Sequence, residues 1–197
     1  MINQLIESGI LKSKSAIKAF NSVKREDFVR PEYREHAYEN IPLPMFEMST
    51  ISQPLTVAAM TEALDVKKDQ KILEIGTGSG YQAAILSILV GPKGKVITIE
   101  INEEVYEFGK GNLKDYPNVK TILSDGSLGY AKEAQYDRIV ITASASAVPK
   151  ELIEQLAVGG IMMIPVNDKM FRIIKIGKNK IRKEFMGYYA FVPLREK

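Results

Sequence analysis

Strand-like and helix-like patterns alternate along most of the chain from residue 55 onward. Short apolar runs predict strands, and apolar residues recurring at helical spacing predict helices. The predicted strands are 71–75, 95–100, 119–123, 137–142 and 161–166, and the predicted helices are 55–64, 81–90, 102–114 and 149–156. This alternation predicts an α/β fold with a mostly parallel, doubly wound sheet and helices on both faces. Two further strands, 170–176 and 180–192, are joined by a turn at Lys178-Asn179, which predicts an antiparallel C-terminal hairpin.

The N-terminal part of the chain has a different pattern. Residues 1–22 predict two short helices, and Ser15 is the expected cap of the second. Pro31 predicts the start of a third short helix that runs to Ala37 or Tyr38.

Residues 41–54 contain three prolines and show no clear period. The segment is too apolar for a solvated linker, so we expect an ordered loop. The chain is therefore divided into an N-terminal helical extension with its loop, residues 1–54, and an α/β domain, residues 55–197.

A glycine-rich turn follows the first strand of this domain. Residues 71–81 are KILEIGTGSGY, and Glu100 ends the next strand twenty residues after Gly80. Glycines allow the backbone to approach a ligand closely, and the following helix offers free N–H groups at its N-terminus. A carboxylate at the end of the second strand is placed to bind ribose hydroxyls. The segment therefore predicts a nucleotide-type site.

The spacing of the glycines distinguishes between nucleotides. Gly76, Gly78 and Gly80 give G-x-G-x-G, and the third glycine of a dinucleotide fingerprint would fall at Tyr81. With Glu74 in front, the E-x-G-x-G-x-G pattern instead resembles motif I of the class I S-adenosylmethionine-dependent methyltransferases. This resemblance implies S-adenosyl-L-methionine as the cofactor.

Other strand ends add polar residues. Asp125-Gly126 follows the strand 119–123, and Thr142 ends the strand 137–142. Because ligands of parallel sheets bind at the carboxyl ends of the strands, we expect these residues and the glycine turn to meet at one crevice.

The composition excludes several chemistries. The 197 residues include no cysteine and one histidine, His36. Disulfides, thiolate zinc sites, a cysteine nucleophile and multi-histidine metal sites are therefore excluded, and we expect no metal. The net charge of +3 is too small to indicate a nucleic-acid partner, and the basic cluster 175–183 is interpreted as a solvated hairpin turn with charged flanks. There is no apolar run long enough to span a membrane and no secretory signal, so we expect a cytoplasmic protein without membrane contact.

Four further segments carry a more specific resemblance. They are AYENIPLP at 37–44, TISQP at 50–54, TASASAVPKELIEQL at 142–156 and FVPL at 191–194. Together with the glycine turn they resemble the protein-L-isoaspartate O-methyltransferase family, over residues 23–194. TISQP is the specific part, because other class I methyltransferases share only the glycine turn and the acidic positions.

The resemblance implies a Rossmann-like, seven-stranded, doubly wound sheet with a reversed last hairpin, and isoaspartyl-containing proteins and peptides as substrates. It makes Ser52 the active-site serine. The residues that it and the glycine turn place at the cofactor are Thr50, Ile51, Ser52, Gln53, Glu74, Gly76, Thr77, Gly78, Gly80, Glu100, Ile101, Asp125, Gly126 and Thr142.

One departure from the family pattern concerns the substrate pocket. The family usually has a glycine-containing stretch between PLP and TIS, whereas residues 45–49, MFEMS, contain no glycine. We therefore expect this loop to take a different path and to alter the shape of the pocket.

The implied reaction is methyl transfer to the free carboxylate of an L-isoaspartyl residue, which starts repair through a succinimide. A carboxylate is already ionised at pH 7, so no strong general base is required. Ser52 is expected to hydrogen-bond the substrate, since nothing nearby would activate it as a nucleophile. Two alternatives stay open: a class I methyltransferase of RNA or a small molecule, and a non-catalytic nucleotide-binding protein of the same fold. Homo-oligomer formation is also open.

Overall fold

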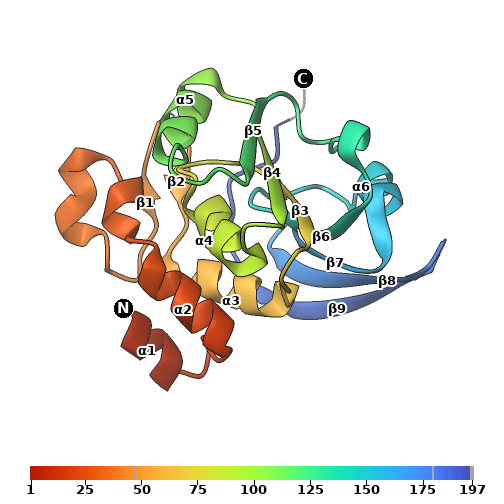
Figure 1. Cartoon of the computed structure of the whole chain (residues 1–197), viewed down its shortest axis with the longest axis horizontal. Coiled ribbons are helices and arrows are strands. Elements are labelled where there is room, and N and C mark those ends of the chain that lie inside the picture. The colour runs from red at the N-terminus through yellow and green to blue at the C-terminus, as the bar shows by residue number, and fades with distance from the viewer. Residues whose placement is uncertain (47, 179, 196–197) are drawn as a thin grey trace.

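The computed structural model describes residues 1–46, 48–178 and 180–195. Its centre is a seven-stranded sheet in the order β5-β4-β3-β6-β7-β8-β9 (Figure 1). The strands are β3 (Lys71–Ile75), β4 (Lys95–Glu100), β5 (Val119–Leu123), β6 (Tyr136–Ile141), β7 (Leu156–Val166), β8 (Lys169–Gly177) and β9 (Lys180–Tyr188). The pairs from β5 to β7 are parallel, and β8 runs antiparallel to both neighbours. The predicted fold class is confirmed.

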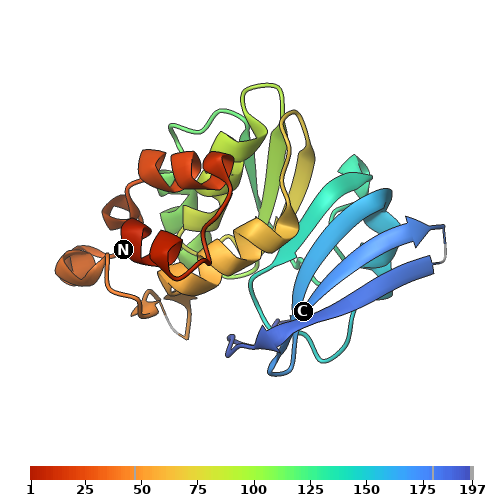
Figure 2. The same cartoon turned by 90° about the horizontal axis from the view of Figure 1, so that it is seen from below.

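Helices cover both faces of this sheet (Figure 2). One buried cluster joins α3 (Pro54–Leu64), α4 (Tyr81–Val90) and α5 (Glu103–Asn112) to the sheet, and a second cluster joins α6 (Lys150–Gln155) to the opposite face. Strand β3 is buried on both sides, since Ile72 belongs to the first cluster and Leu73 to the second. This explains why the parallel strands read as continuous apolar runs. In the described part of the chain, no helix is long and apolar enough to cross a membrane.

The N-terminal extension packs on the face that carries α3 and α4 (Figure 2). It consists of α1 (Ile2–Glu7), α2 (Lys14–Ser22) and two 3₁₀ helices, η1 (Arg25–Phe28) and η2 (Pro31–His36). The predicted cap of α2 was wrong by two residues. Ser13 caps the helix, because its hydroxyl accepts the N–H of Ala16 at 3.2 Å, whereas Ser15 already lies in the first turn. The third predicted helix is η2, which ends at His36.

The C-terminal half differs from the predicted boundaries in three places. Pro149 precedes α6 as its cap, and β7 begins directly after α6, five residues earlier than predicted. Gly159, at φ +84°, lies inside β7 where the register with β6 shifts, so it forms an irregularity in the strand. Strand β9 ends at Tyr188 instead of 192. The turn predicted at Lys178-Asn179 includes Asn179, which lies outside the described residues.

Beyond β9 the chain leaves the sheet and pairs with the loop after β6. The N–H of Ser144 donates to the carbonyl of Val192 at 2.8 Å, and the N–H of Leu194 donates to the carbonyl of Ser144 at 2.8 Å. This pairing carries the C-terminal segment 192–195 across the carboxyl ends of the parallel strands.

We expect the basic cluster at 175–183 to be solvated from its sequence, but the structure buries one of its lysines. Lys175 is buried, and its Nζ donates to the carbonyls of Ile153, Glu154 and Leu156 at 2.7, 3.2 and 2.6 Å. These carbonyls lie at the C-terminal end of α6, where a cation is favourable and the last carbonyls lack helical partners. Lys175 therefore joins β8 to α6.

A buried carboxyl group lies in the middle of β3. Glu74 has no exposed surface, and burial raises the pKa of its carboxyl from 4.5 to about 8. The hydroxyl of Thr98 on β4 donates to Oε2 at 2.5 Å, while Oε1 has no partner among the described residues. Thr98 is also hydrogen-bonded to the hydroxyl of Thr77 at 2.8 Å, which connects Glu74 to the glycine turn.

Replacement of Glu74 should change how stability depends on pH. Between about pH 4.5 and 8 the unfolded chain loses this proton while the folded chain keeps it, so the free energy of unfolding falls as the pH rises and levels off above about pH 8. Glu74→Gln removes this contribution. The test is urea unfolding of both proteins at pH 5 and pH 7. From pH 5 to pH 7, the free energy of unfolding of Glu74→Gln minus that of wild type should rise by about 2–3 kcal/mol. Exposed Glu104→Gln is the control, and an unchanged difference at the two pH values would contradict the assignment.

Candidate active site

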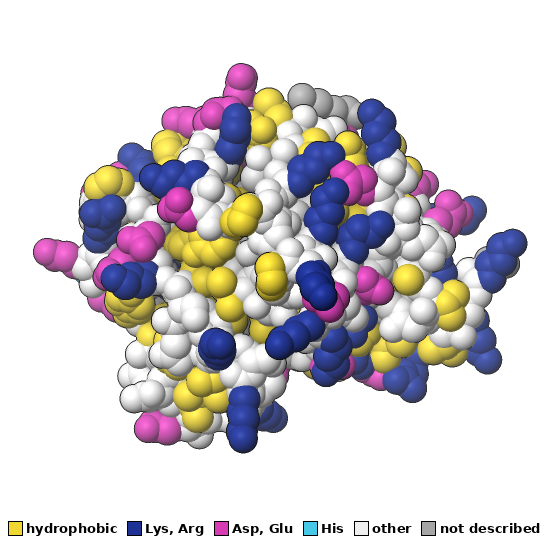
Figure 3. Space-filling model, in the orientation of Figure 1, with side chains coloured by type: hydrophobic (Ala, Val, Ile, Leu, Met, Phe, Trp, Pro, Cys, Tyr) yellow, Lys and Arg dark blue, Asp and Glu magenta, His cyan; other side chains and the backbone are white. Residues whose placement is uncertain are grey.

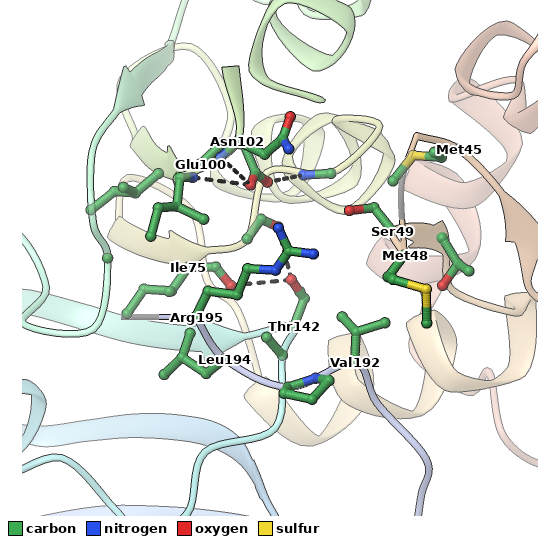
Figure 4. A pocket seen from close by; sticks show the side chains of 18 residues that line it. Met45, Met48, Ser49, Ile75, Glu100, Asn102, Thr142, Val192, Leu194 and Arg195 are labelled. Atoms are coloured by element: carbon green, nitrogen blue, oxygen red, sulfur yellow. Dashed lines mark hydrogen bonds between the residues drawn. The ribbon is translucent and has the colours of Figure 1, made fainter. Parts of the chain in front are cut away.

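A cavity of about 320 Å³ opens at the carboxyl ends of β3, β4 and β6 (Figure 4). Its walls come from the turns after four strands, from the loop before α3 and from the C-terminal segment 192–195. The lining residues are Met45, Met48, Ser49, Thr50, Ile75, Gly76, Gly78, Ile99, Glu100, Ile101, Asn102, Gly126, Thr142, Ala143, Val192, Pro193, Leu194 and Arg195. The four turns meet as predicted, because the carboxyl ends of parallel strands lie at one edge of the sheet.

Glu100 joins two of these turns. Its Oε2 accepts the N–H of Gly78 at 3.0 Å, and its Oε1 accepts the N–H groups of Ile101 and Asn102 at 3.0 and 3.1 Å (Figure 4). An ionised carboxylate offers about four acceptor positions. Backbone N–H groups fill two of these positions on Oε1 and one on Oε2. About one acceptor position, on Oε2, therefore stays available to a ligand hydroxyl.

The glycine turn passes very close to the end of β6. A Cβ atom at Gly76, where φ is +94°, would lie 2.3 Å from Oγ1 of Thr142. The single proton of that hydroxyl is shared between the carbonyls of Ile75 and Gly76, at 3.1 and 2.8 Å. Thr142 therefore holds the start of the turn against the end of β6. At the end of the turn, Gly80 has φ +86° and lies against Leu113, which follows α5. Only glycine combines these backbone angles with this packing.

Most of the predicted site residues line this cavity, here called the main cavity, or one of two spaces beside it. Seven line the main cavity: Thr50, Gly76, Gly78, Glu100, Ile101, Gly126 and Thr142. A recess of about 50 Å³ adds Ile51, Ser52 and Thr77, and a groove of about 740 Å³, here called the outer groove, adds Gln53. Ser52 lines both the recess and the outer groove, and its hydroxyl has no hydrogen-bond partner within the described ranges.

Three predicted residues line none of these spaces. Glu74 lies behind the turn, in the core, and Gly80 lies under it against Leu113. The Oδ1 atom of Asp125 accepts the N–H of Ser127 at 2.8 Å. This bond closes the turn that brings Gly126 to the cavity, so the carboxylate supports the turn.

The loop without glycine forms part of the cavity wall. Strands β1 (Leu43–Pro44) and β2 (Thr50–Ile51) pair as a small hairpin, and the N–H of Met45 donates to the carbonyl of Ser49 at 2.9 Å. Phe46 packs edge-to-face on Phe108 of α5, with ring centroids 5.4 Å apart. Glu47, within the stretch expected to take a different path, lies outside the described residues.

Sequence reasoning missed the methionines and the C-terminal segment. Met45 and Met48 line the cavity from the glycine-free loop, and Val192 to Arg195 line it from the other side. Figure 4 shows the guanidinium of Arg195 directed into the cavity between Glu100 and Thr142. The segment FVPL marked this region as part of the resemblance, but no local pattern indicates that its backbone pairs with Ser144.

The site can hold an adenosine-type ligand. Its walls are mainly apolar, with one carboxylate that keeps an acceptor position, which suits a flat aromatic group joined to a hydroxyl-bearing sugar. The glycine turn lets the rest of such a ligand pass close to the backbone.

Comparisons with known proteins agree with this geometry. The family model for protein-L-isoaspartate(D-aspartate) O-methyltransferase matches residues 1–197. A protein-L-isoaspartate O-methyltransferase of Ignicoccus hospitalis is 45% identical over 203 residues, which cover 100% of this chain and 96% of that protein. The Methanopyrus kandleri protein of the same name is 43% identical over 98% of this chain and 89% of its own.

Solved structures show the same fold. A structure described as a protein-L-isoaspartate O-methyltransferase of Plasmodium falciparum, in complex with S-adenosyl-L-homocysteine, has a TM-score of 0.89 at 24% identity and covers 100% of this chain and 97% of its own. A second protein-L-isoaspartate O-methyltransferase has a TM-score of 0.89 at 30% identity and covers 99% of this chain and 65% of its own. With the family model matching the whole chain, this protein belongs to the protein-L-isoaspartate (D-aspartate) O-methyltransferase family and is a methyltransferase.

Proposed function

We propose that this protein transfers the methyl group of S-adenosyl-L-methionine to the free carboxylate of L-isoaspartyl residues in proteins and peptides. The observation that carries the proposal is the position of Ser52, at the boundary between the recess under the glycine turn and the outer groove. A residue placed there can touch an acceptor in the groove and remain next to the cofactor. The names of the relatives and the S-adenosyl-L-homocysteine bound to the Plasmodium falciparum structure support the same reaction.

Within this proposal the main cavity holds the adenosine part of the cofactor. A ribose hydroxyl would donate to the remaining acceptor position of Glu100, and Gly126 would lie against the adenine. Ile75 and Ile99 offer apolar surface on the same side of the cavity. Bound there, the cofactor supplies an electrophilic methyl group on a sulfonium.

The protein's part in the chemistry is to position and shield the reactants. A carboxylate oxygen of the substrate forms the new O–CH3 bond while the S–CH3 bond breaks, so a cationic sulfonium and an anionic carboxylate become a neutral thioether and a neutral ester. The nucleophile is ionised without help, which agrees with a site that contains no histidine or cysteine. Alignment of the reacting atoms and exclusion of water lower the barrier. The hydroxyl of Ser52 donates to the carboxylate and fixes its orientation.

The methyl ester is the first product of a repair sequence. The methoxy group of the ester leaves the carbonyl carbon more readily than the oxygen of a carboxylate does, so the neighbouring backbone nitrogen can attack that carbon, release methanol and close a succinimide. Hydrolysis of that ring returns part of the material as normal aspartyl residues.

The RNA alternative finds less support in the charges around the site. No charged side chain lies among the described residues that line the outer groove. Figure 3 shows acidic side chains among the basic ones on the face in view. Recognition of an RNA backbone depends on a basic surface beside the site.

The substrate class can be tested with two peptides that differ only in an isoaspartyl or an aspartyl residue. With labelled S-adenosyl-L-methionine, we expect methyl transfer to the isoaspartyl peptide and none to the aspartyl peptide, because only the former presents the shifted carboxylate. Binding of S-adenosyl-L-homocysteine is measured in parallel. Cofactor binding without transfer to either peptide would refute the proposed substrate.

The role of Ser52 can be tested separately. Ser52→Ala should lower kcat/KM for the isoaspartyl peptide by about 10–100-fold, the effect of losing one hydrogen bond to a charged group. The affinity for S-adenosyl-L-homocysteine should change by less than about threefold, since the hydroxyl faces the acceptor. Ser22→Ala, at an exposed position of α2, is the matched control. An unchanged kcat/KM in Ser52→Ala would remove the serine from the mechanism.

A further inference from the structure

The outer groove extends well beyond the atoms that react. It runs from the loop before α3 to the end of β9 and the segment that follows. Its lining residues are Pro42, Met48, Thr50, Ser52, Gln53, Leu55, Thr56, Thr142, Met186, Gly187, Tyr188, Tyr189, Ala190, Phe191, Val192 and Pro193. Not one of them carries a charge, although 26% of the chain is Asp, Glu, Lys or Arg.

The groove adjoins the main cavity. Met48, Thr50 and Thr142 line both spaces, as do Val192 and Pro193. A polypeptide whose isoaspartyl carboxylate reaches Ser52 must therefore lay its neighbouring residues along this groove.

Several apolar side chains in the groove are exposed without being part of the core. Tyr188 is 69% exposed, Met48 74% and Met186 41%. Tyr188 is held edge-to-face against Phe185, with ring centroids 5.2 Å apart. Exposed apolar groups gathered along a groove are typical of binding surfaces, and methionine adapts to ligands of varied shape.

The uncharged character of the described lining residues discriminates between substrates. A charged residue next to the isoaspartate would lose water in the groove and meet no opposite charge among the described lining residues. An apolar or aromatic neighbour would instead bury surface against Tyr188 and the two methionines.

We infer that the outer groove makes this enzyme selective for isoaspartyl residues flanked by apolar or aromatic residues, and that Met48, Met186 and Tyr188 determine this selectivity. The inference rests on the proposed function and names the class of substrate that the same site prefers. The occupant of the groove is the substrate peptide, because the groove leads directly to Ser52.

The test uses the full-length protein and three isoaspartyl peptides of one length, with leucine and phenylalanine, glycine, or lysine and glutamate as the flanking residues. We expect kcat/KM for the apolar peptide to exceed that for the charged peptide by at least about tenfold, the discrimination typical of apolar pockets. The difference should lie mainly in KM, since the flanks do not take part in the chemistry.

Variants of the groove should remove the preference and leave the reaction intact. Tyr188→Ala and Met186→Ala, which lie in the outer groove and not in the main cavity, should reduce the ratio between the apolar and charged peptides to about threefold or less while the glycine-flanked peptide keeps its kcat. Tyr106→Ala, on α5 outside the groove, is the matched control and should keep the full ratio.

The outcomes separate the two proposals. Equal kcat/KM for all three peptides would overturn the groove inference and leave the proposed function standing. No transfer to any isoaspartyl peptide would overturn both. Light scattering on wild type and Tyr188→Ala completes the test: dissociation of an oligomer by the substitution would assign the groove to a second copy of the chain and overturn the inference.

Discussion

The carboxylate of Glu100 is the contact on which the main cavity, the proposed cofactor site, depends. It accepts N–H groups from the glycine turn after β3 and from its own turn after β4, and so ties two neighbouring strand ends together. Backbone N–H groups that a buried carboxylate satisfies are held in one orientation. The glycines then supply the close approach that side chains would prevent, as Gly76 does against Thr142.

Two segments that are distant in the sequence complete the walls of the cavity around Glu100 and the glycine turn. The N-terminal extension brings the loop with Met45, Met48 and Ser52, and the C-terminal segment reaches the opposite wall through its pairing with Ser144. The described residues that these two segments place at the cavity and the recess include no histidine, cysteine or carboxylic acid. This is consistent with a reaction in which the substrate brings an ionised nucleophile and the cofactor brings the activated methyl group. The enzyme then has to align the two reactants and exclude water.

The regular strands and helices of this structure could be predicted from the sequence. So could the positions at which the backbone requires a particular kind of residue, such as glycine. Alternating strands and helices, the glycine turn and Glu100 all follow from local patterns. The missed features are those in which a distant partner decides the outcome. Lys175 is buried because the end of α6 happens to lie over β8, and β7 begins early because β6 offers a partner on both sides of the irregularity at Gly159. The C-terminal segment left the predicted strand because Ser144 provides backbone hydrogen bonds elsewhere.

The central claim, that Glu100 both builds the turn and binds the cofactor, is tested most directly by calorimetric titration of Glu100→Gln with S-adenosyl-L-homocysteine. Glutamine keeps the size of the side chain but sets an NH2 donor against backbone N–H donors, so part of the network cannot form. The account predicts an affinity lower by about 100-fold or more, from the loss of at least two hydrogen bonds at a charged group. Glu103→Gln, exposed at the start of α5, should bind as wild type does. Binding by Glu100→Gln within about threefold of wild type would contradict the account.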